Sequence, residues 1–184
     1  MAGAADRLAS DLAAADTASE SEFRALLDEY GTLVYRVAYS LVREAPMAED
    51  ITQETMLKVW QGLPGFRSDA PIKHWIVRIA HNTAVSALRR RRDEAHDPQE
   101  WVIADRESPA DVGRSVEDRA IREAFEKAIG QLDQTSRTIV LLREIEGLGY
   151  EEISEVLELP LPTVKTRLFR ARRVLATELE GWRR

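Results

Sequence analysis

The sequence contains no cysteine, so it can form no disulfide and offers no thiolate to a metal ion. Its apolar residues never form a run near the roughly 20 that a membrane-spanning helix needs, and the N-terminus lacks the basic, then apolar pattern of a secretory signal. Glycine is sparse, with 9 in 184 residues, while helix-forming residues dominate. These absences predict an all-α protein of the cytoplasm, with no membrane partner.

Acidic residues outnumber basic ones, giving a formal net charge of −6, but the charges are unevenly distributed. Residues 63–92 hold seven basic residues and one acidic residue, and residues 165–184 hold seven and two. Between these blocks, residues 93–118 hold nine acidic and two basic residues. Counterion release at phosphates depends on local cations rather than on the charge of the whole chain. The two basic blocks therefore predict two separate nucleic-acid surfaces.

The most informative stretch lies near the C-terminus, where a short helix over 150–157 and a proline-containing break precede a longer basic helix that opens at Pro162. Apolar residues recur along one face of this longer helix: Val164, Leu168, Ala171 and Leu175. The opposite face carries Lys165, Thr166, Phe169, Arg170 and Arg173. The two helices predict a helix-turn-helix whose second helix enters the major groove. Taken alone, the longer helix fits a solvated basic face with one exposed aromatic equally well.

The N-terminal half predicts long helices over 22–44, 48–62 and 72–92, each with apolar residues at helical spacing. The helix over 48–62 has an outer face on which polar and acidic residues surround a leucine: Asp50, Gln53, Glu54, Leu57 and Gln61. A leucine among carboxylates favours a protein partner, and a solvated acidic face is the alternative.

The helix over 72–92 carries a polar stripe of histidine, arginine and asparagine, and it ends in the four arginines 89–92. This stripe favours a nucleic-acid surface, the alternative being an ordinary polar face followed by a solubilising tail. His74 and His81 are seven residues apart, unlike the His-x-x-x-His spacing of a helical zinc site, so no metal site is predicted.

The chain divides into four expected parts. Residues 1–20 are rich in Ala, Asp and Ser and have too little apolar surface to fix a helix, so a mostly disordered extension is expected. Residues 21–92 form a first small helical domain, and residues 93–118 form a flexible acidic linker. Residues 119–184 form a second small domain that contains the helix-turn-helix.

Four stretches in this order resemble the extracytoplasmic-function (ECF) group of the sigma-70 family of bacterial RNA polymerase sigma factors: 48–54, 66–84, 142–153 and 162–172. The first is similar to the family's acidic segment that docks on the clamp helices of the largest polymerase subunit. The second is similar to the region that recognises and melts the minus-ten element. The last two are similar to the C-terminal domain, whose final helix reads the minus-thirty-five element.

The resemblance implies a role for individual residues of this chain. Polymerase docking would use Asp50, Gln53, Glu54 and Leu57. Contacts to the minus-ten element would use Arg67, Ser68, Asp69, Lys73, His74, Arg78, His81 and Asn82. Contacts to the minus-thirty-five element would use Thr163, Lys165, Thr166, Phe169, Arg170, Arg172 and Arg173. In the family, the loop that corresponds to Arg67–Lys73 captures a base flipped out of the non-template strand. Asp69-Ala70-Pro71-Ile72 departs from the Gly-x-Ser-Phe that family members often have there, so the identity of that base does not carry over to this chain.

The expected function is a transcription initiation factor that binds core RNA polymerase and directs it to promoter DNA. An anti-sigma factor is a further partner that the family implies. No nucleophile–base pattern, phosphate-binding loop or metal motif is present, so neither catalysis, a cofactor nor a small-molecule substrate is expected. The alternative is a helix-turn-helix regulator that binds DNA without polymerase.

Overall fold

The computed structural model describes residues 3–67, 71–94 and 124–178, and within these it contains helices and no strand. The expected all-α class is therefore confirmed. The N-terminal domain consists of α1 (Gly3–Val42), α2 (Ala45–Gly62), the short 3-10 turn η1 (Leu63–Gly65) and α3 (Ile72–Glu94). The C-terminal domain consists of a helical segment at 124–130, then α5 (Gln134–Val140), the π-helical turn η2 (Leu141–Ile145), α6 (Tyr150–Val156) and α7 (Leu161–Glu178).

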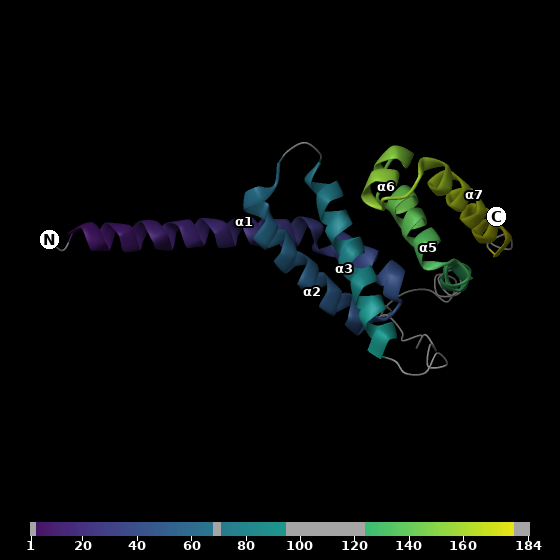
Figure 1. Ribbon diagram of the computed structural model, residues 1–184, viewed down its shortest axis with the longest axis horizontal. Coiled ribbons are helices and arrows are strands. Elements are labelled where there is room, and N and C mark those ends of the chain that lie inside the picture. The colour runs from purple at the N-terminus through teal and green to yellow at the C-terminus, as the bar shows by residue number, and fades with distance from the viewer. Residues whose placement is uncertain (1–2, 68–70, 95–123, 179–184) are drawn as a thin grey trace, which may run out of the picture.

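Helix α1 corrects the expectation of a disordered extension over residues 1–20, because it begins at Gly3. Residues 4–30 contain neither glycine nor proline and are rich in alanine, the residue with the highest helix propensity. The helix can therefore extend beyond the part of the chain that packs. Figure 1 shows its first half projecting away from the other helices.

The N-terminal domain packs α1, α2 and α3 against one another through residues that the helical periodicity placed inward. Val37, Val59 and Ile76 are fully buried at the centre of this bundle. The chain turns from α1 into α2 within two residues, where Arg43 adopts a positive φ of 55°. Pro46 follows in the first turn of α2, where its missing N–H needs no intrahelical partner.

The helix-turn-helix prediction is confirmed by α6 and α7. The backbone N–H of Gly149 donates to the Glu152 carboxylate at the start of α6, which satisfies one of the free donors of that helix end. Glu158 takes a positive φ of 54° after α6, and Pro160 accepts hydrogen bonds from the N–H groups of Thr163 and Val164 as α7 begins. These local features fix the angle at which α7 leaves the turn.

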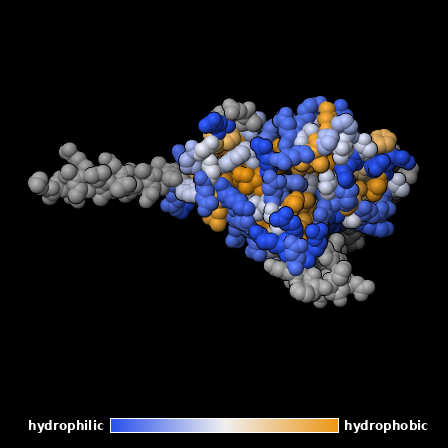
Figure 2. All heavy atoms as spheres, in the orientation of Figure 1, coloured by the Kyte–Doolittle hydropathy of each residue, from blue (hydrophilic) through white to orange (hydrophobic). Residues whose placement is uncertain are grey.

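The two domains lie against each other, with α3 beside α6 (Figure 1). Leu132, Ile139 and Leu142 of the C-terminal domain belong to the same buried apolar cluster as Val37 of α1. In Figure 2 the two domains form one continuous body, whose visible face is mostly hydrophilic with small apolar areas. None of the described helices is long and apolar enough to cross a bilayer.

Candidate nucleic-acid interface

Helix α7 presents the side chains that the helical pattern assigned to DNA. Val164, Leu168 and Ala171 are at most 1% exposed and anchor α7 on the domain core. On the opposite side, Phe169 is 62% exposed. The polar residues around it are also exposed: Lys165, Thr166, Arg170, Arg172 and Arg173. Thr163 is half-buried at the start of the helix. The predicted division of α7 into a buried and an outward face is therefore confirmed.

The exposed cations of α7 differ in the carboxylates they meet. Arg172 donates from both Nε and Nη2 to Oε1 of Glu144 on η2, at 2.9 and 2.7 Å. This hydrogen bond with Glu144 is the main cause that raises the pKa of Arg172, so its positive charge is held beside a negative one. Lys165 lies 5.8 Å from the centre of the Tyr150 ring, a cation–π contact across the turn between α6 and α7.

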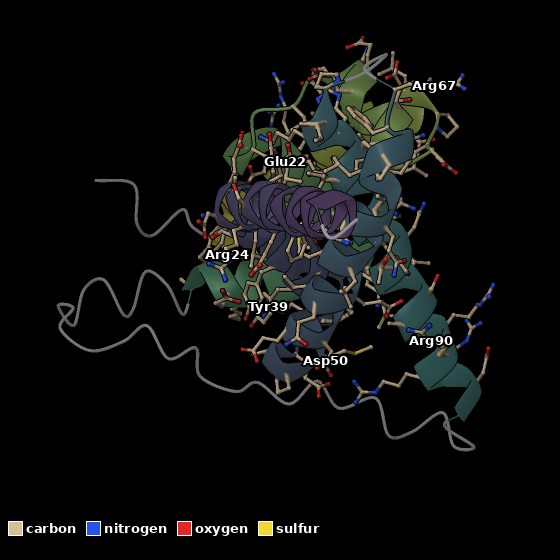
Figure 3. The ribbon with its side chains drawn as sticks, turned by 90° about the vertical axis from the view of Figure 1, so that its left-hand side faces the viewer. Glu22, Arg24, Tyr39, Asp50, Arg67 and Arg90 are labelled. Atoms are coloured by element: carbon tan, nitrogen blue, oxygen red, sulfur yellow. The ribbon has the colours of Figure 1, made fainter. Side chains whose placement is uncertain are left out.

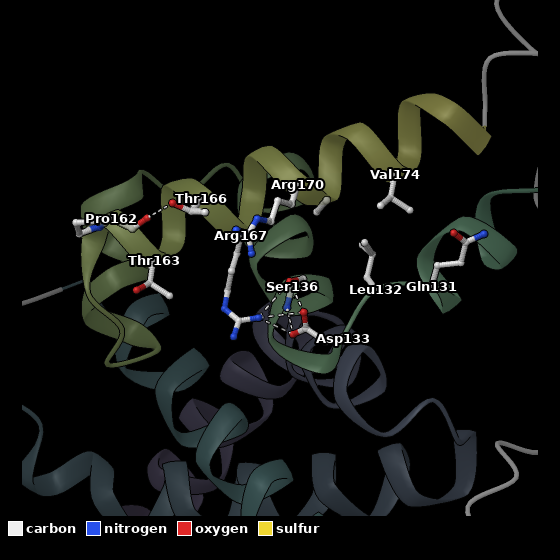
Figure 4. A pocket seen from close by; sticks show the side chains of 11 residues that line it. Gln131, Leu132, Asp133, Ser136, Pro162, Thr163, Thr166, Arg167, Arg170 and Val174 are labelled. Atoms are coloured by element: carbon white, nitrogen blue, oxygen red, sulfur yellow. Dashed lines mark hydrogen bonds and ion pairs between the residues drawn. The ribbon is translucent and has the colours of Figure 1, made fainter.

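Arg167 connects α7 to the start of α5, a role that helical periodicity did not predict. Its Nη1 lies 2.9 and 3.0 Å from the two carboxylate oxygens of Asp133. Asp133 also caps α5 by accepting from the backbone N–H and hydroxyl of Ser136. Figure 4 shows this network at the wall of a cavity of about 530 Å³ that Arg170 also borders. The network fixes the position of α7 relative to α5.

In the sequence, only the Asp-x-x-Ser spacing of Asp133 and Ser136 signals this arrangement, since it marks a helix N-terminus. Nothing local indicated that the partner of Asp133 would come from residue 167, because the two positions are 34 residues apart.

The polar stripe on α3 is divided by the structure into an outward part and a covered part. Arg78 and Asn82 are exposed one turn apart. His81 is half-buried beside them, and desolvation by burial is the main cause that lowers its pKa below the ordinary value. Lys73 and His74, at the start of the helix, point toward the C-terminal domain, where they meet carboxylates of Glu146 and Glu152.

An aromatic pair supports the loop that precedes α3. The rings of Phe66 and Trp75 lie 5.0 Å apart between centres. The backbone at Gly62 approaches Trp75 so closely that a Cβ there would be 2.9 Å from the indole. Arg67 is exposed at the top of the molecule in Figure 3. The other two predicted loop contacts, Ser68 and Asp69, lie outside the described residues.

The outer face of α2 carries the residues assigned to polymerase docking. Asp50 and Gln53 are exposed, and Leu57 is 56% exposed although it is a large apolar residue. Glu54 is instead paired with Lys58 at 2.7 Å and with Arg90 of α3 at 3.2 Å. The hydrogen bond from Lys58 is the main cause that lowers the pKa of Glu54.

Figure 3 places Asp50 and Arg67 at opposite ends of the N-terminal domain. The face of α2 that carries Asp50 is thus separate from the loop that carries Arg67. No group of three or more histidine and acidic side chains that could hold a metal ion occurs within the described part of the chain.

Comparison with known proteins finds a family match for each of the two domains. Family models for sigma-70 region 2 and sigma-70 region 4 match residues 26–94 and 122–175. The RNA polymerase sigma-H factor of Pseudomonas aeruginosa is 34% identical over 169 residues, which is 86% of each chain. The ECF RNA polymerase sigma factor SigW of Bacillus subtilis is 27% identical over 171 residues, covering 87% of this chain and 90% of the relative. The sigma factor RpoE, solved in complex with the anti-sigma factor NepR from Bartonella quintana, is similar with a TM-score of 0.74 and 26% identity, covering 86% of this chain and 97% of that one.

Proposed function

Since the chain belongs to the ECF group of the sigma-70 family, we propose that it is a transcription initiation factor that binds core RNA polymerase and directs it to promoters. The observation that carries this proposal is the outward face of α7, where Phe169 stands among cations while Leu168 is buried. An exposed aromatic ring at this position has no role in the core. A helix of this kind suits readout of base edges between two rows of phosphates.

At the upstream promoter element, we assign base contacts to the centre of the outward face of α7. Phe169 can contact a thymine methyl group, and Arg170 can bond the acceptor edge of guanine. Lys165, Thr166 and Thr163 lie N-terminal to them, in the part of a recognition helix that meets base edges. Arg172 and Arg173 hold phosphates, and Arg172 must exchange Glu144 for a phosphate when it does so.

At the minus-ten element, we assign contacts to Arg67, Ser68, Asp69, Lys73, His74, Arg78, His81 and Asn82. A base that leaves the stack needs a pocket that compensates for lost stacking. The Phe66–Trp75 pair gives the loop a rigid aromatic support on which such a pocket can be built. Neutral His81 would act there as a hydrogen-bonding group rather than as a cation, because burial lowers its pKa.

Polymerase docking is assigned to Asp50, Gln53, Glu54 and Leu57 on α2. The exposed Leu57 supplies apolar area, and Asp50 supplies a charge for a basic partner surface. Glu54 contributes through its pair with Lys58 on the same helix and through its pair with Arg90, which joins the middle of α2 to α3. A leucine surrounded by polar groups is the arrangement expected at a protein interface, where a buried centre has a polar rim.

We further propose a division of labour along the chain. Residues 21–92 bind polymerase and the minus-ten element, residues 119–184 bind the minus-thirty-five element, and the acidic residues 93–118 connect them. The protein acts in the cytoplasm, carries out no catalysis, and uses no cofactor. The Bartonella relative was solved with an anti-sigma factor, and we propose a partner of this class here as well.

Reconstitution tests the proposal directly. The purified chain is mixed with core polymerase, isolated by gel filtration, and used to transcribe a promoter library. We expect co-elution with core polymerase and transcripts that share two upstream sequence elements. Phe169→Ala should keep the co-elution and change only the upstream element. Duplex binding without any polymerase association would instead identify the stand-alone regulator.

A further inference from the structure

A cavity of about 560 Å³ is bounded by the second half of α1, the start of α2, the helical segment at 124–130, α5 and η2. Tyr39, labelled in Figure 3, is one of the α1 residues that line it. None of the described residues that line this cavity belongs to the surfaces assigned to promoter DNA or to polymerase. Cavities of about 300–1,000 Å³ hold small organic molecules in other proteins, so this one is large enough to be a ligand site.

Most of the cavity wall is apolar. The aliphatic and phenyl side chains that supply this apolar wall are Phe125, Ile129, Val140, Leu141 and Ile145. Val140 and Leu141 are buried in the main apolar cluster, whereas Phe125 and Ile145 are 38% and 56% exposed. An occupant with an apolar body would remove the exposed part of this surface from water, which is favourable.

Flat groups of the N-terminal domain lie at the same cavity. The rings of Tyr35 and Tyr39 are stacked, with centres 6.0 Å apart and an angle of 15° between their planes. The guanidinium of Arg43 lies 5.7 Å from the centre of the Tyr39 ring. Aromatic rings and guanidinium groups pack favourably against the face or edge of another ring. These three side chains therefore favour an occupant that is itself flat and aromatic.

The charges at this cavity do not balance. The described residues that line it include three arginines and one acidic residue. Arg43 pairs with Glu126 at 2.7 Å, and Arg36 pairs with Glu146, which is not among the lining residues, at 3.0 Å. No carboxylate of the described residues forms an ion pair with Arg137. The cavity therefore has an excess of positive charge beside its apolar wall.

Arg137 is the cation that an occupant would most affect. Its side chain is buried, with the residue only 7% exposed, and its Nε and Nη1 donate to the backbone oxygens of Ser40 and Leu132 at 2.8 and 2.7 Å. Its Nη2 donates to no acceptor within the described residues. Burial lowers the pKa of Arg137, and the positive charge of Arg43 lowers it further. An anion bound beside these two arginines would offset both effects.

We propose that this cavity binds an organic anion with a flat aromatic body. The acid group of the ligand, a carboxylate or sulfonate, accepts from Arg43 and Arg137, and its rings lie among Tyr35, Phe125 and Ile145. The ligand thus satisfies the excess of positive charge and the exposed apolar wall together. The site does not depend on the proposed function, because binding to the free protein requires neither polymerase nor DNA.

Two fluorescent probes with the same rings test the need for a negative charge. 8-Anilinonaphthalene-1-sulfonate is an aromatic anion, and N-phenyl-1-naphthylamine lacks only the sulfonate. Titrated into the full chain, the sulfonate should bind saturably to one site, about tenfold more tightly than the neutral compound, because its acid group forms charge-assisted hydrogen bonds. Equal affinities would contradict the role of the arginines. Unlabelled 1-naphthoate should displace the sulfonate probe at lower concentrations than decanoate, and the reverse order would contradict a flat aromatic ligand.

Two variants with matched controls locate the site. Arg43→Gln should weaken binding of the sulfonate probe about tenfold, whereas Arg24→Gln, which loses only a pair with Glu20 within α1, should bind like wild type. Ile145→Glu places a negative charge at an exposed position of the cavity and should also weaken binding. Val85→Glu, the same change at an exposed residue of α3 outside the cavity lining, should not. Circular dichroism checks that each variant is folded. Cavity variants that bind as tightly as their controls would overturn the site.

Methyl-resolved NMR with 1-naphthoate gives a readout that does not depend on substitution. The ring current of a bound ligand shifts only the methyl groups close to it, so Ile129 and Ile145 should shift together and saturably. Ile51 on α2 and Ile153 on α6 are buried and do not line the cavity, so their methyl signals should stay in place. Signals of Ile129 and Ile145 that do not move, or equal shifts at all four isoleucines, would refute the proposed site.

Discussion

Two adjacent residues of α7 allow the assignment of its faces to be tested in one pair of variants. Leu168 is 1% exposed and belongs to the apolar cluster that contains Leu142, Ile153 and Val164, whereas Phe169 is 62% exposed. Leu168→Ala removes buried methyl groups and leaves a cavity. Phe169→Ala removes a ring that contacts mostly water in the free protein. The two changes should therefore affect different properties of the protein.

The expected magnitudes differ enough to be separated. Leu168→Ala should lower the free energy of unfolding by about 2–5 kcal/mol, with a fall in Tm of about 2–4 °C for each kcal/mol in a chain of this size. Phe169→Ala should change stability by no more than about 0.5 kcal/mol. It should instead cost about 1–3 kcal/mol of discrimination at one base pair of the upstream element.

Urea unfolding followed by circular dichroism measures the first effect, and transcription of a library with a randomised upstream element measures the second. Thr177→Ala, an exposed change near the end of the same helix, should alter neither property. The reasoning fails if Leu168→Ala is as stable as the wild type. It also fails if Phe169→Ala loses as much stability as Leu168→Ala, or if it leaves every base preference unchanged.

Three further predictions follow from single residues. Asp50→Ala should weaken binding to core polymerase about tenfold, or ~1.4 kcal/mol. The Tm should not change, because Asp50 is exposed. A loss of Tm that matches the loss of binding would contradict a docking role. Gly62→Ala should cost about 1–3 kcal/mol of stability in urea unfolding, because its Cβ would lie 2.9 Å from the Trp75 side chain. Gly65→Ala is the control, because a Cβ there meets open space. Equal stabilities of the two variants would contradict the predicted clash with Trp75. Burial raises the pKa of Asp133, but hydrogen bonds from Ser136 and the charge of Arg167 outweigh burial and lower it. The stabilisation of the fold by ionised Asp133 should therefore be lost as the pH falls below about 4. Asp133→Asn, which keeps the helix cap, should flatten that part of the plot of unfolding free energy against pH. Parallel plots for the wild type and Asp133→Asn would refute the role of the charge.

The sequence alone was sufficient for the features that depend on neighbours within a few turns of helix. Helical periodicity is local, so the spacing of Val164, Leu168 and Ala171 determined which face of α7 is buried and hence where Phe169 points. The same reasoning placed Ile51 and Val59 inside α2. The order of the four short motifs also indicated the family, because each motif is itself a local pattern.

For residues 1–20, the low apolar content predicted a mostly disordered extension, and here the structure differs. The structure continues α1 through this stretch to Gly3, because alanine favours the helix even where no core supports it. Apolar periodicity reports whether a helix packs, and it says little about whether an alanine-rich segment is helical.

Only the tertiary structure decided which outward charges are exposed to a partner and which are already paired. Arg170 and Arg172 lie on the outward side of the same helix, yet Arg172 meets Glu144, which is 28 residues away in the sequence. Lys73 and His74 belong to a predicted DNA-binding stripe, but they meet acidic groups of the other domain. The ion pair of Arg36 and Glu146 spans 110 residues. No local pattern encodes such pairs, because the partner of a long charged side chain depends on how whole helices pack.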